Sequence, residues 1–144
     1  MSESNKQVAL DFLAAMDAGD GAAMDRCLTR DAVTNTRGFA GVSGRRSREM
    51  MVATASAFKA IVPTGFRPTM HKIVAEGDTV VLEFEADAVL SSGEPYCNQY
   101  VFIFTFRDGR ICQLNEYFCT VLADKVMLPL LAQEGESYAT GDAN

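Results

Sequence analysis

The chain has 144 residues, of which 48% are hydrophobic and 22% charged, and its formal net charge is −6. A chain of this length can bury one sizeable core, so we expect a single domain over residues 1–144. The acidic balance and scattered basic residues exclude a nucleic-acid footprint, and no apolar run is long enough to cross a membrane.

The four cysteines, at positions 27, 97, 112 and 119, show no C-x-x-C or Cys/His spacing of a metal site. Glycine-rich phosphate loops are also missing from the sequence, so we expect neither a metal nor a cofactor. The N-terminal residues lack the basic start and apolar stretch of a signal peptide. We therefore expect a cytoplasmic protein with free thiols.

Helical patterns come first in the chain. Residues 4–18 carry an apolar stripe, Asp20 can cap a short helix over 22–28, and a third helix is predicted over 47–61. A short strand over 31–36 and a glycine-rich loop lie between the second and third helices.

Strand patterns follow and are joined by tight turns. The predicted turns fall at 76–78, 91–95 and 108–109, and the residues between them form four strands. The last segment, "KVMLPLL", is interpreted as a tail with an apolar side. Helices first and meandering strands second are typical of the α+β class.

The strand register decides which carboxylates share a face of the sheet. A two-residue turn at Asp108-Gly109 places Glu116 opposite Val101. A three-residue loop of residues 92–94 then places Glu85 opposite the same Val101. A four-residue loop would instead send Glu85 and Glu116 to opposite faces.

With the first register, one face mixes converging carboxylates with apolar side chains, as pocket linings do. The catalytic candidates are Glu116 and Glu85. The other candidate site residues contact the substrate in this interpretation, and they are Glu83, His71, Tyr96, Asn98, Val101, Ile103, Leu114 and Phe118. The second face carries Phe84, Phe102 and Phe104 among others and needs burial by helices or by a partner subunit.

A carboxylate among apolar groups loses solvation, which raises its pKa, and a second carboxylate nearby raises it further. Such a pair can move a proton between two carbons. The simpler interpretation is that Glu83 and Glu85 line a solvated face and that His71 is exposed.

The segments "VAEGDTVVLEFEADAVLSSGEPY" and "YVFIFTFRDGRICQLNEYF" resemble the nuclear transport factor 2-like superfamily, and within it the SnoaL-like proteins. The resemblance runs from about Val8 to Leu131. It implies a cone, in which a curved, mostly antiparallel sheet holds three N-terminal helices on its concave face around an apolar pocket. It also implies a homodimer through the outer sheet face.

The resemblance to limonene epoxide hydrolases is partial. Their two acidic residues fall on Glu116 and Glu85, but their arginine falls on Glu83. Their water-holding tyrosine and asparagine fall on Thr34 and Thr36. Epoxide hydrolysis is therefore the third of three hypotheses.

The first hypothesis is a cofactor-free enzyme of the isomerase or cyclase type, which moves a proton on a small hydrophobic substrate. The second is a ligand-binding or assembly module of the same fold without turnover. The pH titration of Glu85 and Glu116 separates the two: normal pKa values for both favour the module, and one pKa raised well above the ordinary carboxyl value favours the enzyme.

Overall fold

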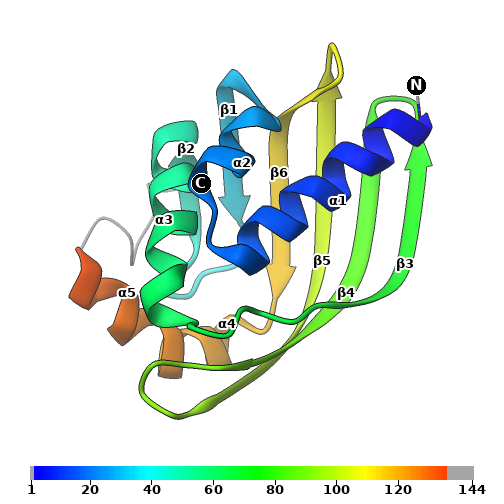
Figure 1. Ribbon diagram of the computed structural model, residues 1–144. Coiled ribbons are helices and arrows are strands. Elements are labelled where there is room, and N and C mark those ends of the chain that lie inside the picture. Colours follow the sequence, from blue (N-terminus) through cyan, green and yellow to red (C-terminus); the bar gives the residue numbers. More distant parts are fainter. Residues whose placement is uncertain (1, 136–144) are drawn as a thin grey trace.

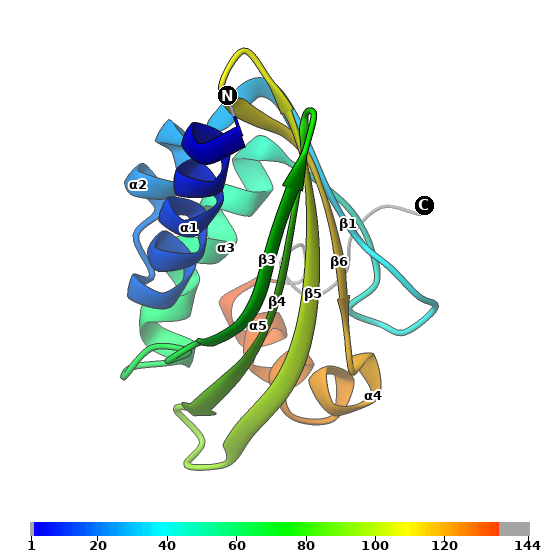
Figure 2. The ribbon, with the colours of Figure 1, turned by 90° about the vertical axis from the view of Figure 1, so that its right-hand side faces the viewer.

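The computed structural model describes residues 2–135 as one curved sheet with helices on a single face (Figure 1). Seen along its edge, the sheet wraps around the helices, and its strands bend toward them at the lower end (Figure 2). This arrangement confirms the predicted α+β cone. No helix within the described residues is long and apolar enough to span a membrane.

Three helices cover the sheet, as predicted. They are α1 (Ser2–Ala18), α2 (Gly21–Arg26) and α3 (Arg48–Ile61). The Asp20 carboxylate accepts a hydrogen bond from the Ala23 amide at 3.0 Å and so satisfies one free donor at the start of α2. The first helix begins two residues earlier than the pattern predicted.

The six strands form one sheet in the order β2-β1-β6-β5-β4-β3. Only the β1–β6 pair is parallel. The bounds of the strands are β1 (Leu28–Thr36), β2 (Gly44–Ser47), β3 (Thr69–Glu76), β4 (Thr79–Val89), β5 (Pro95–Arg107) and β6 (Arg110–Phe118). The short strand β2 lies partly in the segment that was expected to be a loop.

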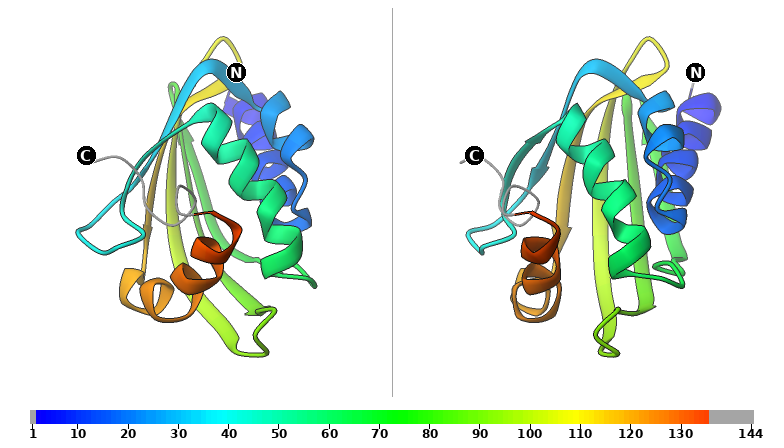
Figure 3. Two further views of the ribbon diagram at one scale, coloured as in Figure 1. Left: turned by 90° about the vertical axis from the view of Figure 1, so that its left-hand side faces the viewer. Right: turned by 60° about the vertical axis from the view of Figure 1, so that its left-hand side comes forward.

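Residues 119–134 form what we call the C-terminal arm. It contains α4 (Thr120–Leu122), a π-helical segment η1 (Ala123–Met127) and α5 (Leu128–Glu134). The sequence predicted only an apolar tail here. The arm lies near the lower end of α3, which α5 contacts (Figure 3). It adds helical structure beyond the three helices predicted.

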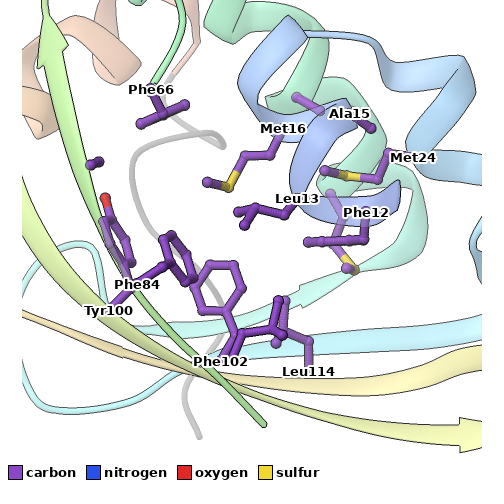
Figure 4. Close-up of a cluster of buried hydrophobic side chains, with 14 of the residues drawn as sticks. Phe12, Leu13, Ala15, Met16, Met24, Phe66, Phe84, Tyr100, Phe102 and Leu114 are labelled. Atoms are coloured by element: carbon purple, nitrogen blue, oxygen red, sulfur yellow. The ribbon is translucent and has the colours of Figure 1, made fainter. Parts of the chain in front are cut away.

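The phenylalanine face of the sheet is the inner face. Phe84, Phe102 and Phe104 are each at most 1% exposed, and Phe12 of α1 packs edge-on against Phe104 with ring centroids 5.4 Å apart. Figure 4 shows Phe12 and Met16 reaching from α1 toward the aromatic side chains of the sheet. The helices of the same chain therefore bury these rings, which is the first of the two alternatives that the sequence left open.

The β4–β5 hairpin keeps the predicted face of its side chains. Val89 pairs with Pro95, and the Leu90 amide donates to the Glu94 carbonyl at 2.9 Å. The observed register therefore differs from the predicted register by two residues. Because side chains alternate with a period of two, this shift leaves Glu83 and Glu85 on the face of Val101. Glu85 is paired with Gln99 rather than with Val101.

A β-bulge in the last hairpin overturns the predicted face of Glu116. The Asp108-Gly109 turn is as predicted, with Arg107 paired to Arg110, but the register shifts between Phe106 and Thr105. The extra residue is Cys112, and beyond it Glu116 pairs with Phe102 instead of Val101. Glu116 therefore points inward, to the helices, while Glu85 points outward.

Candidate active site

A cavity of about 110 Å³ lies between the inner face of the sheet, the three helices and the C-terminal arm. Its lining is mostly apolar, with four methionines and five phenylalanines. Polar groups enter it at a few points only: Thr34, Thr36, Arg46, Thr54, Tyr96, Tyr100 and Glu116. A concave apolar site with few convergent polar groups is the usual form of a small-molecule pocket.

The carboxylate in the cavity is held by a chain of contacts across three neighbouring strands. Glu116 on β6 stands beside Thr36 on β1, and Arg46 lies on β2. The Thr36 hydroxyl donates to Glu116 Oε2 at 2.9 Å and accepts from the Arg46 guanidinium at 3.2 Å. Arg46 is 9% exposed and also donates to the Val42 carbonyl at 3.0 Å.

Burial raises the pKa of Glu116 above the ordinary carboxyl value, and this is the largest effect on it. The Thr36 hydrogen bond and the Arg46 charge act in the opposite direction and favour the ionised form. The residue keeps part of its surface accessible, and that surface opens onto the cavity it lines. The carboxylate is thus desolvated, oriented and reachable by a ligand.

Thr34 adds a second hydroxyl beside the carboxylate. Its side chain lies near enough to lower the pKa of Glu116 slightly. Within the described residues, its buried Oγ1 nevertheless has no hydrogen-bond partner of normal geometry. A polar atom in this state, on the cavity wall, is available to a ligand or a water molecule.

A hydrogen-bonded pair of tyrosines occupies another part of the wall. The Asn98 amide donates to the Tyr96 hydroxyl at 3.0 Å, and the Tyr100 and Tyr96 hydroxyls are 3.1 Å apart. Asn98 cannot be turned around, because its Oδ1 accepts from the backbone amides of Gln99 and Cys119. Burial raises the pKa of both tyrosines, and that of Tyr100 well above its ordinary value.

The donors and acceptors of this pair can be counted. Two neutral hydroxyls carry two protons, and one proton is used in the bond between them. The Tyr96 hydroxyl accepts the hydrogen bond from the Asn98 amide, so its own proton is not used in that contact. Whichever tyrosine donates to the other, the contacts made by the described residues leave one hydroxyl proton unused. That proton is available to an acceptor in the cavity.

The structure separates the two predicted catalytic residues. Glu85 lies on the outer face, where its Oε1 is 2.7 Å from His71 Nε2, and both side chains are exposed. Glu83 is exposed on the same face. The prediction that Glu85 and Glu116 form a carboxylate pair was therefore wrong, and neither Glu83 nor His71 reaches the cavity.

The remaining candidates divide in the same way. Val101 and Ile103 are half-buried on the outer face and do not line the cavity, contrary to the prediction. Tyr96 and Phe118 do line it. Leu114 is fully buried but does not line the cavity, and Asn98 donates a hydrogen bond to Tyr96.

Sequence reasoning missed several residues of the site. Arg46 was not among the candidate site residues, because the strand that turns it inward was not predicted. Tyr100 was not selected, although it alternates with Phe102 and Phe104 along β5 and so shares their face. Thr34 and Thr36 were named only through the resemblance to epoxide hydrolases.

Comparisons with known proteins agree with this fold. The family model described as "SnoaL-like domain" matches residues 9–114. An uncharacterized protein of Bacillus subtilis (strain 168), YesE, is 36% identical over 52 residues, which span 35% of this chain and 35% of YesE.

Solved structures resemble the chain over nearly its whole length. An epoxide hydrolase of the LEH-like type from M. tuberculosis has a TM-score of 0.71 at 23% identity, over 92% of this chain and 96% of the other. A putative isomerase from Bacillus subtilis has a TM-score of 0.72 at 21% identity, over 96% and 97%. A putative SnoaL-like polyketide cyclase from Jannaschia sp. CCS1 has a TM-score of 0.66 at 16% identity, over 88% and 92%. At these identities the likeness establishes the fold alone.

Proposed function

Because the chain belongs to the SnoaL-like domain family, we propose that its cavity catalyses cofactor-free proton transfer on a small hydrophobic ketone. Family membership fits several reaction types, so the choice among them is made on the site. The observation that carries the proposal is Glu116, a desolvated carboxylate inside an apolar cavity that also holds an unused tyrosine proton.

Each part of the reaction has a residue suited to it. Glu116 removes a proton from the carbon next to the carbonyl, so that the C–H bond breaks and an O–H bond forms on the carboxylate. The electron pair moves into the new C=C bond, and negative charge collects on the carbonyl oxygen. The free tyrosine hydroxyl of the Tyr96–Tyr100 pair donates to that oxygen.

The second half of the reaction returns the same proton. Glu116 delivers it to a different carbon of the enolate, which shifts the double bond and restores the carbonyl. No oxidant, reductant or further reactant is needed. Thr36 and Arg46 stabilise the ionised carboxylate before and after the transfer, and so keep Glu116 able to act as a base near neutral pH.

A β,γ-unsaturated cyclohexenone is a suitable first probe, because it has one ring and its conjugated isomer absorbs in the ultraviolet. We expect the wild-type protein to accelerate this isomerisation over buffer. Glu116→Gln keeps the shape of the side chain and removes its titration, and we expect a loss of roughly 10²–10⁴-fold in rate.

Glu85→Gln is the matched control, because it makes the same change on the outer face of the sheet. Its rate should equal that of the wild type. If Glu116→Gln is as active as Glu85→Gln, Glu116 has no part in the chemistry. If the wild type binds the ketone without turnover, the domain is a ligand-binding module rather than an isomerase.

A further inference from the structure

We propose that the C-terminal arm is a movable wall of the cavity and that Asp124 closes it. The inference rests on the proposed function only in that the cavity takes a ligand. Three residues of the arm line the cavity, namely Ala123, Met127 and Leu131. The arm follows directly after Phe118, the last cavity residue of β6.

Asp124 fastens the arm to the loop between β1 and β2. Its Oδ2 accepts from the Gly41 amide at 2.7 Å and its Oδ1 from the Val42 amide at 2.8 Å. Both oxygens of an ionised carboxylate are thus used by backbone donors, which is a strong form of hydrogen bonding. Val42 is itself a cavity residue, so the contact joins two sides of the wall.

The close approach depends on the glycine in the loop. A Cβ atom at Gly41 would lie 2.9 Å from Leu128 Cδ2 and 3.3 Å from both carboxylate oxygens of Asp124. A larger residue would therefore require the Leu128 side chain to turn aside and the Asp124 carboxylate to move by a few tenths of an ångström. The contact between the arm and the loop thus depends on residues of both segments.

The root of the arm is fixed separately. Asn98 donates to the Cys119 carbonyl at 3.1 Å and accepts from the Cys119 amide at 3.1 Å. Beyond this point α4, η1 and α5 start without a side-chain cap, and the middle segment is π-helical. Short uncapped helical segments have little stability of their own, so the arm depends on its buried side chains and on the Asp124 contact to stay closed.

The size of the cavity decides which ligands would need the wall to move. An engineered cavity of about 150 Å³ in another protein accommodates benzene. A cavity of about 110 Å³ is therefore of a size for one ring, and a ligand with two fused rings needs the wall to move. The arm packs through four buried side chains, those of Ala123, Val126, Met127 and Leu131, and its hydrogen bonds to the rest of the chain are at its root and at Asp124.

Ligands of two sizes test the inference. Phenol has one ring, and naphthol has two and resembles the enol of a fused-ring ketone. In Asp124→Asn the new amide group faces a backbone N–H, so one of the two hydrogen bonds is lost. We expect the association rate of naphthol to rise about tenfold in stopped-flow fluorescence, and that of phenol to change less than about twofold.

Glu134→Gln is the matched control, because Glu134 is an exposed carboxylate on the same arm. It should behave as the wild type with both ligands. Amide exchange measured by NMR gives a second readout: Gly41 and Val42 should exchange faster in Asp124→Asn while the amides of β5 keep their protection.

The outcomes separate the two proposals. If the wild type binds neither phenol nor naphthol, the cavity is not a ligand site and the proposed function fails. If the wild type binds both and Asp124→Asn leaves the naphthol rate unchanged, the arm is a fixed wall. A variant that speeds phenol and naphthol equally would also overturn the size-dependent wall.

Discussion

Asn98 lies at the point where the tyrosine pair and the C-terminal arm meet. Its side chain is 3% exposed and its amide group makes contacts with Tyr96 and with both backbone groups of Cys119. We predict that Asn98→Ala is strongly destabilising, because it removes three hydrogen bonds at once, two of them to a residue 21 positions away, and leaves a void.

The magnitude follows from these contacts. A hydrogen bond in a folded protein contributes about 1 kcal/mol net, so three of them amount to about 3 kcal/mol. The Cys119 side of the network is exposed, and water can replace part of that loss, which keeps the expected value at roughly 2–4 kcal/mol. For a chain of this length, 3 kcal/mol lowers the melting temperature by roughly 10 °C.

Urea denaturation followed by circular dichroism measures this change. Gln99→Ala is the matched control on the same strand, because Gln99 is exposed on the opposite face, and we expect a change within about 0.5 kcal/mol. If Asn98→Ala costs less than 1 kcal/mol, water satisfies the whole network. Asn98 would then not be the residue that fixes the root of the arm.

Two further predictions concern stability against pH and assembly. Burial raises the pKa of Glu116 in the folded state above its ordinary value near 4.5. Between the ordinary pKa and the raised pKa, the folded state therefore binds more protons than the unfolded state. The stability of the wild type falls as the pH rises through this window. The side chain of Glu116→Gln cannot titrate, so in urea titrations the stability of this variant relative to wild type should increase from acid to neutral pH. A stability difference that stays constant with pH would contradict a desolvated carboxylate. We also propose a homodimer through the outer sheet face, where Tyr117 is 45% exposed and Ile103 lies on the central strand β5. Sedimentation velocity should show a wild-type dimer that Ile103→Lys converts to a monomer, and a wild-type monomer would exclude this assembly.

The order of helices and strands could be predicted from the sequence because it depends on local patterns. Apolar spacing located the three helices, and Asp108-Gly109 located the tight turn, where both residues adopt positive φ angles of 53° and 77°. The cap at Asp20 was also predictable from residue type and position. These features need no knowledge of distant contacts.

The face of Glu116 could not be obtained from a strict two-residue alternation, because the bulge breaks it. A signal was nevertheless present in the sequence. Ile111 and Leu114 are both fully buried although they are three positions apart, and a regular strand would place them on opposite faces. Only an extra residue between them allows both to point inward, which is what Cys112 provides.

The other parts of the site depend on contacts between distant segments. Arg46 reaches Thr36 only because β2 pairs with β1, and β1 pairs in parallel with β6 from the far end of the chain. The parallel pairing has no local turn that joins its two strands. The contact of Asp124 with Gly41 is of the same kind, since it joins residues 83 positions apart.

The single additional residue in β6 has a consequence for how such a pocket can arise. Deleting one residue between Ile111 and Leu114 would restore regular alternation along the strand. Every side chain of β6 after the deletion would then point to the opposite face of the sheet. The carboxylate would then face outward and Tyr117 would take its place under the helices. In a scaffold of this design, one inserted or deleted residue would move the acid group into or out of the cavity, together with its neighbours on the strand.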